Sequence, residues 1–328
     1  MLKKVVFLGT GGTIAGTAVS AGDNVGYQSA QVGVGQLLAS VPSLARQATA
    51  ECLESEQVAQ IDSKNMDWAI LQRLSHRVEF HLQRGDVGAV VITHGTDTLE
   101  ETAFFLSRVL AAAQLADKPV VLTCAMRPAT ADFPDGPQNL CDALVVAQTP
   151  GACGVLVVCA GEVHAGPQVQ KVHPYRVNAF SSGESGPVGF VEEGRVRWVR
   201  QVPVMGAITD AGALAQRLAG NWPRVEIVIN MVGVGGATVR ALCNANHGAD
   251  APVRGLVVAG TGNGTLNHDM ELALEVVRVQ GVRVVVTSRC FSGQLVVGRD
   301  AIPADPRYLG LPPVKARIAL VLELLGLG

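Results

Sequence analysis

Val5–Gly16 reads VVFLGTGGTIAG, and this stretch decides how the rest of the sequence is interpreted. Its four leading apolar residues are typical of a buried strand in a parallel sheet. The glycines that follow let the backbone turn sharply and approach a ligand closely, and Thr10 and Thr13 place two hydroxyl groups among them. The stretch therefore predicts an α/β fold with a glycine-lined turn after its first strand.

Two common nucleotide-binding loops do not match this turn. A dinucleotide-binding loop has the spacing GxGxxG, but Ile14 stands where the third glycine is needed. A P-loop needs a lysine followed by serine or threonine, and no such pair follows these glycines. A turn whose threonines solvate its own backbone is the commoner arrangement. The turn alone therefore leaves open both a structural role and a nucleophilic hydroxyl.

Strand and helix patterns alternate along the whole chain. Apolar runs predict strands at residues 57–61, 88–92, 119–122, 155–158, 225–229, 255–259 and 282–287. Apolar residues at helical spacing predict helices at residues 66–83, 98–113, 137–147 and 267–280, with a last helix from about residue 312. Residues 187–199 predict a β-hairpin that turns at Glu193-Gly194.

This alternation predicts an α/β protein with two doubly wound parallel-sheet domains, a larger N-terminal one and a smaller C-terminal one. Residues 201–222 lack a strong strand pattern, so we expect a linker there. The N-terminal catalytic domain then covers residues 1–200, and the C-terminal domain covers residues 223–328. Residues 17–35 form a long polar connection, and connections of that length usually have a function.

Composition excludes several classes of partner. Of the 328 residues, 48% are hydrophobic and 16% are charged, so the chain can bury a large core. A formal net charge of -2 gives no electrostatic footprint for nucleic acid or for an acidic membrane surface. No apolar run approaches the roughly 18 residues that span a bilayer. We therefore expect a small-molecule substrate, no nucleic acid and no membrane.

Cysteine and histidine spacing indicates the compartment and argues against a metal. The 7 cysteines are odd in number and lack CxxC spacing, which is typical of reduced thiols in a cytoplasmic protein. The first strand begins near Lys3, which leaves no room for a secretory signal ahead of it. The 7 histidines show no metal-ligand spacing. We expect a cytoplasmic protein without a metal site.

Polar side chains follow three successive predicted strands. They are Thr10 and Thr13 after the first strand, Asp62 and Ser63 after the second, and Thr96 and Asp97 after the third. Because ligands of doubly wound sheets bind beyond the carboxyl ends of the strands, these side chains should face one crevice. Hydroxyl groups beside a carboxylate suit attack by a threonine on an acyl group. No GxSxG nucleophile elbow occurs, which disfavours the common serine-hydrolase arrangement.

These residues also have structural interpretations. The candidates for helix capping are Thr96, Asp97 or a Thr98–Glu101 capping box before one helix, and Ser63 or Asn65 before another. Lys171, in a later polar segment, is by default a solvated surface lysine. Three such loops on successive strands favour a site, but they leave its substrate open.

Two longer motifs give the chain a family resemblance. Thr10–Gly16 (TGGTIAG) and His94–Thr102 (HGTDTLEET) resemble the signatures of the bacterial-type L-asparaginases, amidohydrolases that act on asparagine and often on glutamine. Supporting segments are Ala125–Pro128 (AMRP), Asp135–Leu140 (DGPQNL) and Gly260–Gly264 (GTGNG). The likeness extends over essentially the whole chain.

The resemblance implies roles for particular residues. Thr13 is the expected nucleophile of a threonyl acyl-enzyme, and Tyr27 belongs to a mobile loop that closes over it. Thr96, Asp97 and Lys171 match the second threonine, its adjacent aspartate and a lysine that assists proton transfer. The expected substrate-binding residues are Gly12, Asp62, Ser63, Thr96, Asp97 and Asn263. The turn at Gly12 and the Thr96 backbone are natural N–H donors to an oxyanion.

The resemblance also implies an assembly and a reaction. The family uses no metal or organic cofactor and forms homotetramers, built from intimate dimers, in which the C-terminal domain completes a neighbour's site. This chain departs from the family at Lys64, where many secreted members carry glutamine, and has no glutamate at residues 290–300. The sequence predicts an L-asparagine amidohydrolase. The alternatives are a glutaminase-leaning amidohydrolase and a catalytically silent amino-acid sensor.

Overall fold

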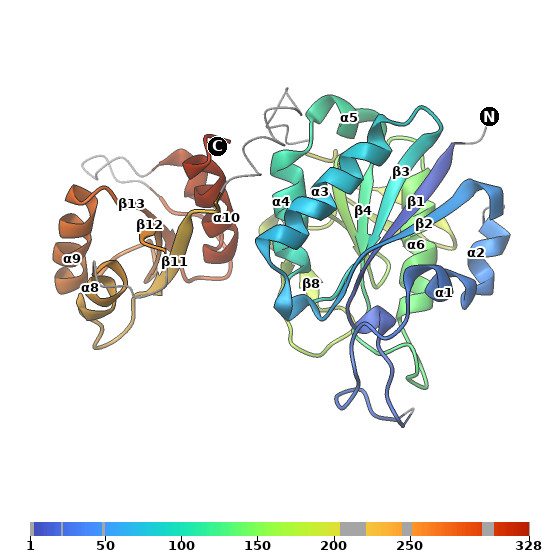
Figure 1. The fold of residues 1–328 in the computed structure, drawn as a ribbon, viewed down its shortest axis with the longest axis horizontal. Helices are drawn as coiled ribbons and strands as arrows, with labels where there is room; N and C mark the ends of the chain where they lie inside the picture. The colour runs from blue at the N-terminus through green and yellow to red at the C-terminus, as the bar shows by residue number, and fades with distance from the viewer. Residues whose placement is uncertain are drawn as a thin grey trace. The chain divides into compact units, whose positions relative to one another are not determined.

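The computed structural model describes residues 3–20, 22–47, 50–203, 221–244, 251–296 and 305–327. The chain divides into two compact units at residues 1–211 and 212–328, and each is described by itself (Figure 1). Most of the predicted linker at residues 201–222 lies outside the described residues. The domain boundaries therefore stay a prediction.

The described part of the N-terminal unit contains an eight-stranded sheet with the order β10-β9-β6-β5-β4-β3-β1-β2. Its strands are β1 (Lys4–Gly11), β2 (Leu53–Ile61), β3 (Val87–Thr93), β4 (Val120–Thr123), β5 (Val155–Cys159), β6 (Glu162–Ala165), β9 (Gly189–Glu192) and β10 (Arg195–Trp198). Strands β1 to β5 are parallel, as predicted.

Three further strands at one edge, β6, β9 and β10, run antiparallel to their neighbours, and β9 and β10 form the hairpin predicted at residues 187–199. Ala160 and Gly161 have φ values of 51° and 78° and reverse the chain tightly after β5. Glu193 and Gly194, with φ values of 48° and 71°, form the corresponding turn of the predicted hairpin. Two consecutive positive φ angles are the geometry of a tight hairpin turn.

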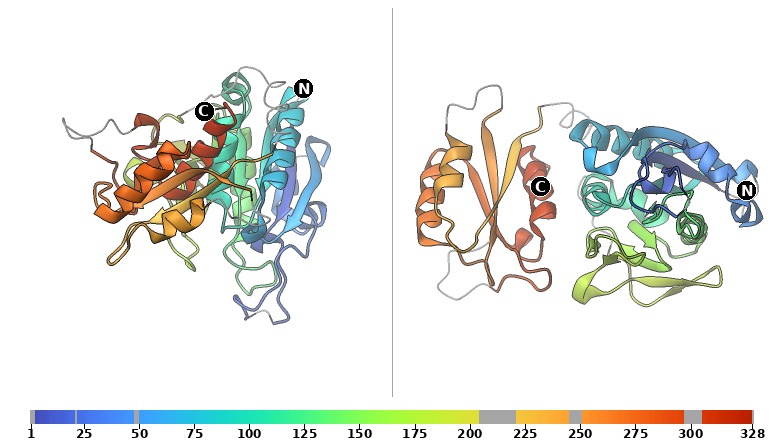
Figure 2. Two further views of the ribbon diagram at one scale, coloured as in Figure 1. Left: turned by 60° about the vertical axis from the view of Figure 1, so that its left-hand side comes forward. Right: turned by 90° about the horizontal axis from the view of Figure 1, so that it is seen from below.

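Helices cover both faces of this sheet (Figures 1 and 2). One face packs against α1 (Val34–Ala39), α2 (Pro42–Gln47) and α6 (Gly136–Gln148), with Phe7, Val91 and Leu156 in the shared core. The other face packs against α3 (Trp68–Gln83) and α4 (Leu99–Val109), and α5 (Ala112–Asp117) follows α4. Coverage on both faces explains why β3, β4 and β5 and most of β1 are apolar, whereas the edge strand β2 is not.

Two predicted helix caps are wrong. The helix α3 is capped by Asp67, whose side chain accepts the Ile70 N–H at 2.8 Å, and not by Ser63 or Asn65. Thr98 precedes α4 without capping it, because its hydroxyl donates instead to the Ser63 carbonyl at 2.8 Å. A local sequence pattern could not reveal this competing tertiary acceptor.

Sequence patterns also missed several short elements. Strands β7 (Gln170–Lys171) and β8 (Phe180–Ser181) form a two-stranded antiparallel pair. Short 3-10 helices lie at Thr13–Ala15, Ala50–Cys52, Ser63–Asn65, Gly183–Ser185 and Pro306–Tyr308. Segments of two or three residues are too brief to show a period.

The C-terminal unit is smaller, as predicted. Its parallel sheet has the order β11-β12-β13, formed by β11 (Arg224–Ile229), β12 (Val253–Gly260) and β13 (Arg283–Ser288). Helices α8 (Ala237–Cys243) and α9 (His268–Val279) share one core with the sheet, and α10 (Pro313–Leu324) packs against β11 and β12. The α/β class is confirmed in both units.

Two features are absent from the described residues. No helix there has the length and apolar character to cross a membrane. No cluster of three or more His, Cys, Asp or Glu side chains there could hold a metal ion. All seven cysteines are free thiols, of which Cys290 is exposed.

Candidate active site

The strand order creates a crevice between β1 and β3. These strands are neighbours in the sheet, but the chain leaves β1 towards β2 on one side and leaves β3 towards β4 on the other. Such a switch point is where open α/β sheets bind ligands. Gly9 pairs with Thr93, so Thr13 and Thr96 follow the ends of two paired strands.

One cavity of about 200 Å³ lies at these strand ends. Its lining residues are Thr13, Asn24, Val25, Tyr27, Thr96, Asp97, Met126, Lys171, Pro174 and Tyr175. All five residues predicted to be catalytic therefore meet around a single small space. Their arrival there from four separate segments is not explained by helix capping or by ordinary surface solvation.

Thr13 lies in a short 3-10 helix directly after the glycine turn. The residue is buried, with 6% of its surface exposed. Its Oγ1 lies 2.6 Å from the Tyr27 hydroxyl oxygen. The loop that carries Tyr27 is closed at its base, where Thr17 and Gln28 exchange two backbone hydrogen bonds of 2.9 Å. The pair of hydroxyl groups can therefore share a proton within a fixed geometry.

A second polar group faces the same cavity. The Lys171 ammonium donates to Thr96 Oγ1 at 2.9 Å and to Asp97 Oδ1 at 2.7 Å. The lysine side chain is 16% exposed, so this ion pair is partly shielded from water. Because Thr96 Oγ1 accepts from the lysine, its own hydroxyl proton is directed elsewhere and is free to be donated.

Close backbone packing joins the loop that carries Thr13 to the loop that carries Thr96. A Cβ atom on Gly12 would lie 2.3 Å from Gly95 Cα, and Gly12 has a φ of 83° that only glycine adopts readily. The Gly12 N–H donates to the Ile61 carbonyl at 2.9 Å, so the fold itself uses this donor. Gly12 brings the loops together, and its N–H is already bonded within the fold. A contact between Gly12 and the substrate stays a prediction.

Ser63 lies directly behind the cavity. It is buried, its Oγ accepts the Asp97 N–H at 3.2 Å, and a Cβ on Gly95 would lie 2.5 Å from that oxygen. Asp62 accepts the Lys64 N–H and pairs with the Lys64 ammonium at 3.2 Å. Neither Asp62 nor Ser63 lines the cavity, so their substrate contacts stay predictions.

Asn263 belongs to the C-terminal unit, in the loop between β12 and α9. Its amide donates to the Val296 carbonyl and accepts the Val296 N–H, both at 2.7 Å. The side chain thus holds a loop within its own unit. A contact between Asn263 and a neighbour's substrate stays a prediction.

The structure adds five residues that sequence patterns did not identify: Asn24, Val25, Met126, Pro174 and Tyr175. The first two lie in the long connection for which a function was expected. Met126 follows the carboxyl end of β4, and Asp135 fixes it by accepting its N–H at 2.9 Å. The last two follow Lys171 in the chain, so proximity to that residue was the available signal.

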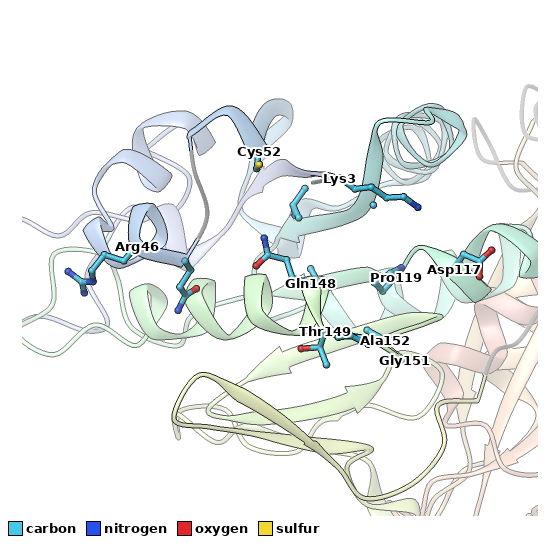
Figure 3. Close-up of a pocket in the computed structure, with 14 residues that line it drawn as sticks. Lys3, Arg46, Cys52, Asp117, Pro119, Gln148, Thr149, Gly151 and Ala152 are labelled. Carbon is cyan, nitrogen blue, oxygen red and sulfur yellow. The ribbon is translucent and has the colours of Figure 1, made fainter. Parts of the chain in front are cut away.

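A larger cavity of about 620 Å³ lies at the opposite, amino end of the strands (Figure 3). Lys3, Gly88 and Pro119 line it from the starts of β1, β3 and β4, and Gln148 lines it from the end of α6. It contains none of the residues predicted to be catalytic. Cavity size alone therefore does not locate the site.

His94 supports the catalytic loop from behind and is fully buried. Its Nδ1 lies 2.7 Å from the Gly95 carbonyl, which can only accept, so Nδ1 carries the proton. Its Nε2 then accepts from the Thr102 hydroxyl at 2.9 Å. Burial lowers the pKa of His94 from 6.5 to about 4, which keeps the ring neutral.

We predict that the protein loses stability between pH 6.5 and pH 4. Burial also lowers the pKa of His164 to about 4, with a smaller contribution from the Arg200 charge. Both histidines take up protons near pH 6.5 when unfolded but only near pH 4 when folded, so acid favours unfolding. Each would lower the free energy of unfolding by up to about 3 kcal/mol. Urea unfolding at pH 7.5 and pH 4.5 measures this.

The histidine titration can be separated from that of paired carboxylates. Ion pairs lower the pKa values of Glu54 and Asp86 to about 2, so those groups lose their stabilising effect at lower pH. His164→Gln should flatten the dependence between pH 6.5 and pH 4. Equal unfolding free energies of the wild type at pH 7.5 and pH 4.5 would contradict the assignment.

Two family profiles match the chain, one in each of its two halves. The family profile described as "Asparaginase, N-terminal" matches residues 4–204, and that described as "Glutaminase/Asparaginase C-terminal domain" matches residues 224–325. The chain belongs to the asparaginase family. Its members' architecture of a large N-terminal and a smaller C-terminal α/β unit is the one described above.

Individual asparaginases resemble the chain over nearly its full length. A glutaminase-asparaginase of Pseudomonas fluorescens biotype A is 38% identical over 98% of this chain and 86% of its own. L-asparaginase 2 of Escherichia coli K12 is 35% identical over 98% and 89%. The crystal structure of a probable cytoplasmic L-asparaginase from Campylobacter jejuni superposes with a TM-score of 0.85 at 34% identity, covering 98% and 95%.

Proposed function

We propose that this asparaginase-family protein hydrolyses L-asparagine to L-aspartate and ammonia through a threonyl ester. The observation that carries the proposal is the single cavity in which the Thr13–Tyr27 hydroxyl pair meets the Thr96–Lys171–Asp97 group. At about 200 Å³, the cavity is smaller than the roughly 300 Å³ or more of drug-sized sites. That volume suits a single amino acid.

In the first step, Thr13 Oγ1 attacks the carbonyl carbon of the side-chain amide. Thr13 gives its hydroxyl proton to Tyr27, and that proton is passed on, by way of the Thr96 hydroxyl in the same cavity, to the leaving nitrogen. The C–N bond then breaks, ammonia leaves and a β-aspartyl ester of Thr13 remains. Among backbone donors, the N–H groups of Thr13 and Thr96 are the ones we assign to the oxyanion, because Gly12 donates to Ile61.

In the second step, water adds to the ester carbonyl. The bond between the carbonyl carbon and Thr13 Oγ1 breaks, the threonine oxygen takes up the proton that the water gives up, and aspartate leaves. Lys171 holds Thr96 in place for both proton transfers. The carboxylate of Asp97, 52% exposed, can also bind the substrate's α-ammonium by a charge-assisted hydrogen bond. This contact would select an α-amino acid over a simple amide.

Glutamine is the second candidate substrate, since three relatives carry the name glutaminase-asparaginase. We expect a higher kcat/KM with asparagine than with glutamine, because the small cavity leaves little room for one more methylene group. Ammonia release measured with both amino acids gives this ratio. Binding of aspartate by calorimetry without ammonia release from either substrate would instead favour an amino-acid sensor.

We also propose a cytoplasmic homotetramer whose C-terminal units, at residues 223–328, complete neighbouring sites. Helix α9 exposes Leu272, Val276 and Val279 on one side while its other side packs in the core, and a second apolar stripe of this kind is typical of an interface. Sedimentation equilibrium measures the assembly. The Campylobacter jejuni protein, named cytoplasmic, supports the proposed compartment.

A further inference from the structure

The backbone of Lys171 is held by a contact that the catalytic scheme does not require. Lys171 lies in the two-residue strand β7, and the next residue, Val172, donates its N–H to Ala179 beside β8 at 2.7 Å. Successive N–H groups of an extended chain point to opposite sides. The Lys171 N–H therefore points away from β8, and Glu100 Oε2 accepts it at 2.9 Å.

Glu100 reaches this N–H from the first turn of α4. Residues 96–100, which lead into α4 and form its start, thus bind Lys171 at two points. Thr96 and Asp97 bind its ammonium, and Glu100 binds its backbone. A bond between a carboxylate and an N–H is stronger than one between neutral groups. Together these contacts hold both ends of the lysine in place, its backbone at α4 and its ammonium at the cavity.

Helix stabilisation alone does not explain this contact. An acidic residue in the first turn favours a helix through its dipole, and Glu101 in the same turn meets that need as well. Glu100 additionally binds a backbone group 71 residues further along the chain. That N–H belongs to the one residue whose side chain joins Thr96 and Asp97.

We propose that Glu100 is a positioning residue for Lys171, an inference that rests on the proposed hydrolysis of asparagine. Without the carboxylate, β7 keeps its pairing with β8 but loses its tie to α4. The ammonium then no longer stays within reach of Thr96. Proton transfer slows, whereas the groups that bind the substrate stay in place. The effect falls on kcat and not on KM.

The experiment compares kcat and KM for asparagine in the wild type and three variants. Glu100→Ala should lower kcat at least tenfold and change KM less than threefold. Glu100→Gln keeps an oxygen that can accept the Lys171 N–H, so it should restore kcat to within about threefold of the wild type. Glu101→Ala removes a carboxylate of the same turn, leaves the Glu100–Lys171 bond in place and should keep near-wild-type kcat.

Each other outcome overturns the inference or the function beneath it. Wild-type kcat in Glu100→Ala removes the positioning role, and so does a Gln variant as slow as the Ala variant. If Glu100→Ala does not fold, Glu100→Asp, too short to reach the N–H, replaces it under the same criteria. No ammonia release by the wild type would instead refute the proposed function, which separates the two failures.

Discussion

Thr13→Ala is expected to lower kcat for ammonia release from asparagine by about a thousandfold or more. The variant removes the atom that we propose forms the ester, and losing a nucleophile removes an interaction made in the transition state. The fold should persist, because the lost hydroxyl pairs with Tyr27 at the cavity and not with the sheet. A discontinuous ammonia assay measures the rate, and circular dichroism checks the fold.

Thr10→Ala provides a matched control for this variant. Thr10 lies three residues earlier, near the end of β1, but its hydroxyl donates to the Thr93 carbonyl at 2.9 Å and Thr10 does not line the cavity. Its loss should reduce stability while most of the activity remains. Thr96→Val is expected to share the loss seen at Thr13. Full activity in both Thr13→Ala and Thr96→Val would end the acyl-enzyme proposal.

Gly12→Ala should reduce both stability and activity more than the addition of a methyl group at any other described position near the site. The new Cβ would lie 2.3 Å from Gly95 Cα and 2.4 Å from Gly95 N, and both are backbone atoms that cannot rotate away. The positive φ of 83° adds strain. We expect a loss of roughly 2–4 kcal/mol in unfolding free energy. We also expect kcat/KM to fall about a hundredfold, because Thr13 is displaced.

Urea unfolding and ammonia release together check this expectation. Gly85→Ala is the matched control, since a Cβ there meets nothing within 4 Å. That variant should keep both stability and rate. Gly12→Ala with the stability and rate of the wild type would show that the two loops can separate without consequence.

The sequence was most informative where chemistry restricts residue type at the end of a strand. Thr13, Thr96 and Asp97 were predictable because each follows an apolar strand in a recognisable motif. Lys171 and Tyr27 were predictable only through family resemblance, since each lies in a polar segment without a period. The parallel order of β1 to β5 was likewise predictable from alternating strands and helices.

What could not be predicted depends on partners distant in the chain. The hydroxyl of Thr98 has the spacing of a cap, yet it donates to Ser63 because the two loops meet. In the sequence, Glu100 is an acidic residue of the kind common in the first turn of a helix. Its second role becomes visible only when the strand that holds Lys171 lies beside it. The reversal after β5 depends on positive φ at Ala160, a residue type that gives no warning of it.

The pairing of β1 with β3 also determines the stage of folding at which the protein becomes able to catalyse its reaction. Thr10 and Thr93, at the ends of these strands, are 83 positions apart, so the two reactive loops meet only after a long segment has closed. Helix α3 can form from local interactions before that closure. Recovery of catalysis during refolding should therefore lag behind recovery of helical signal, and turnover reports completion of the central sheet.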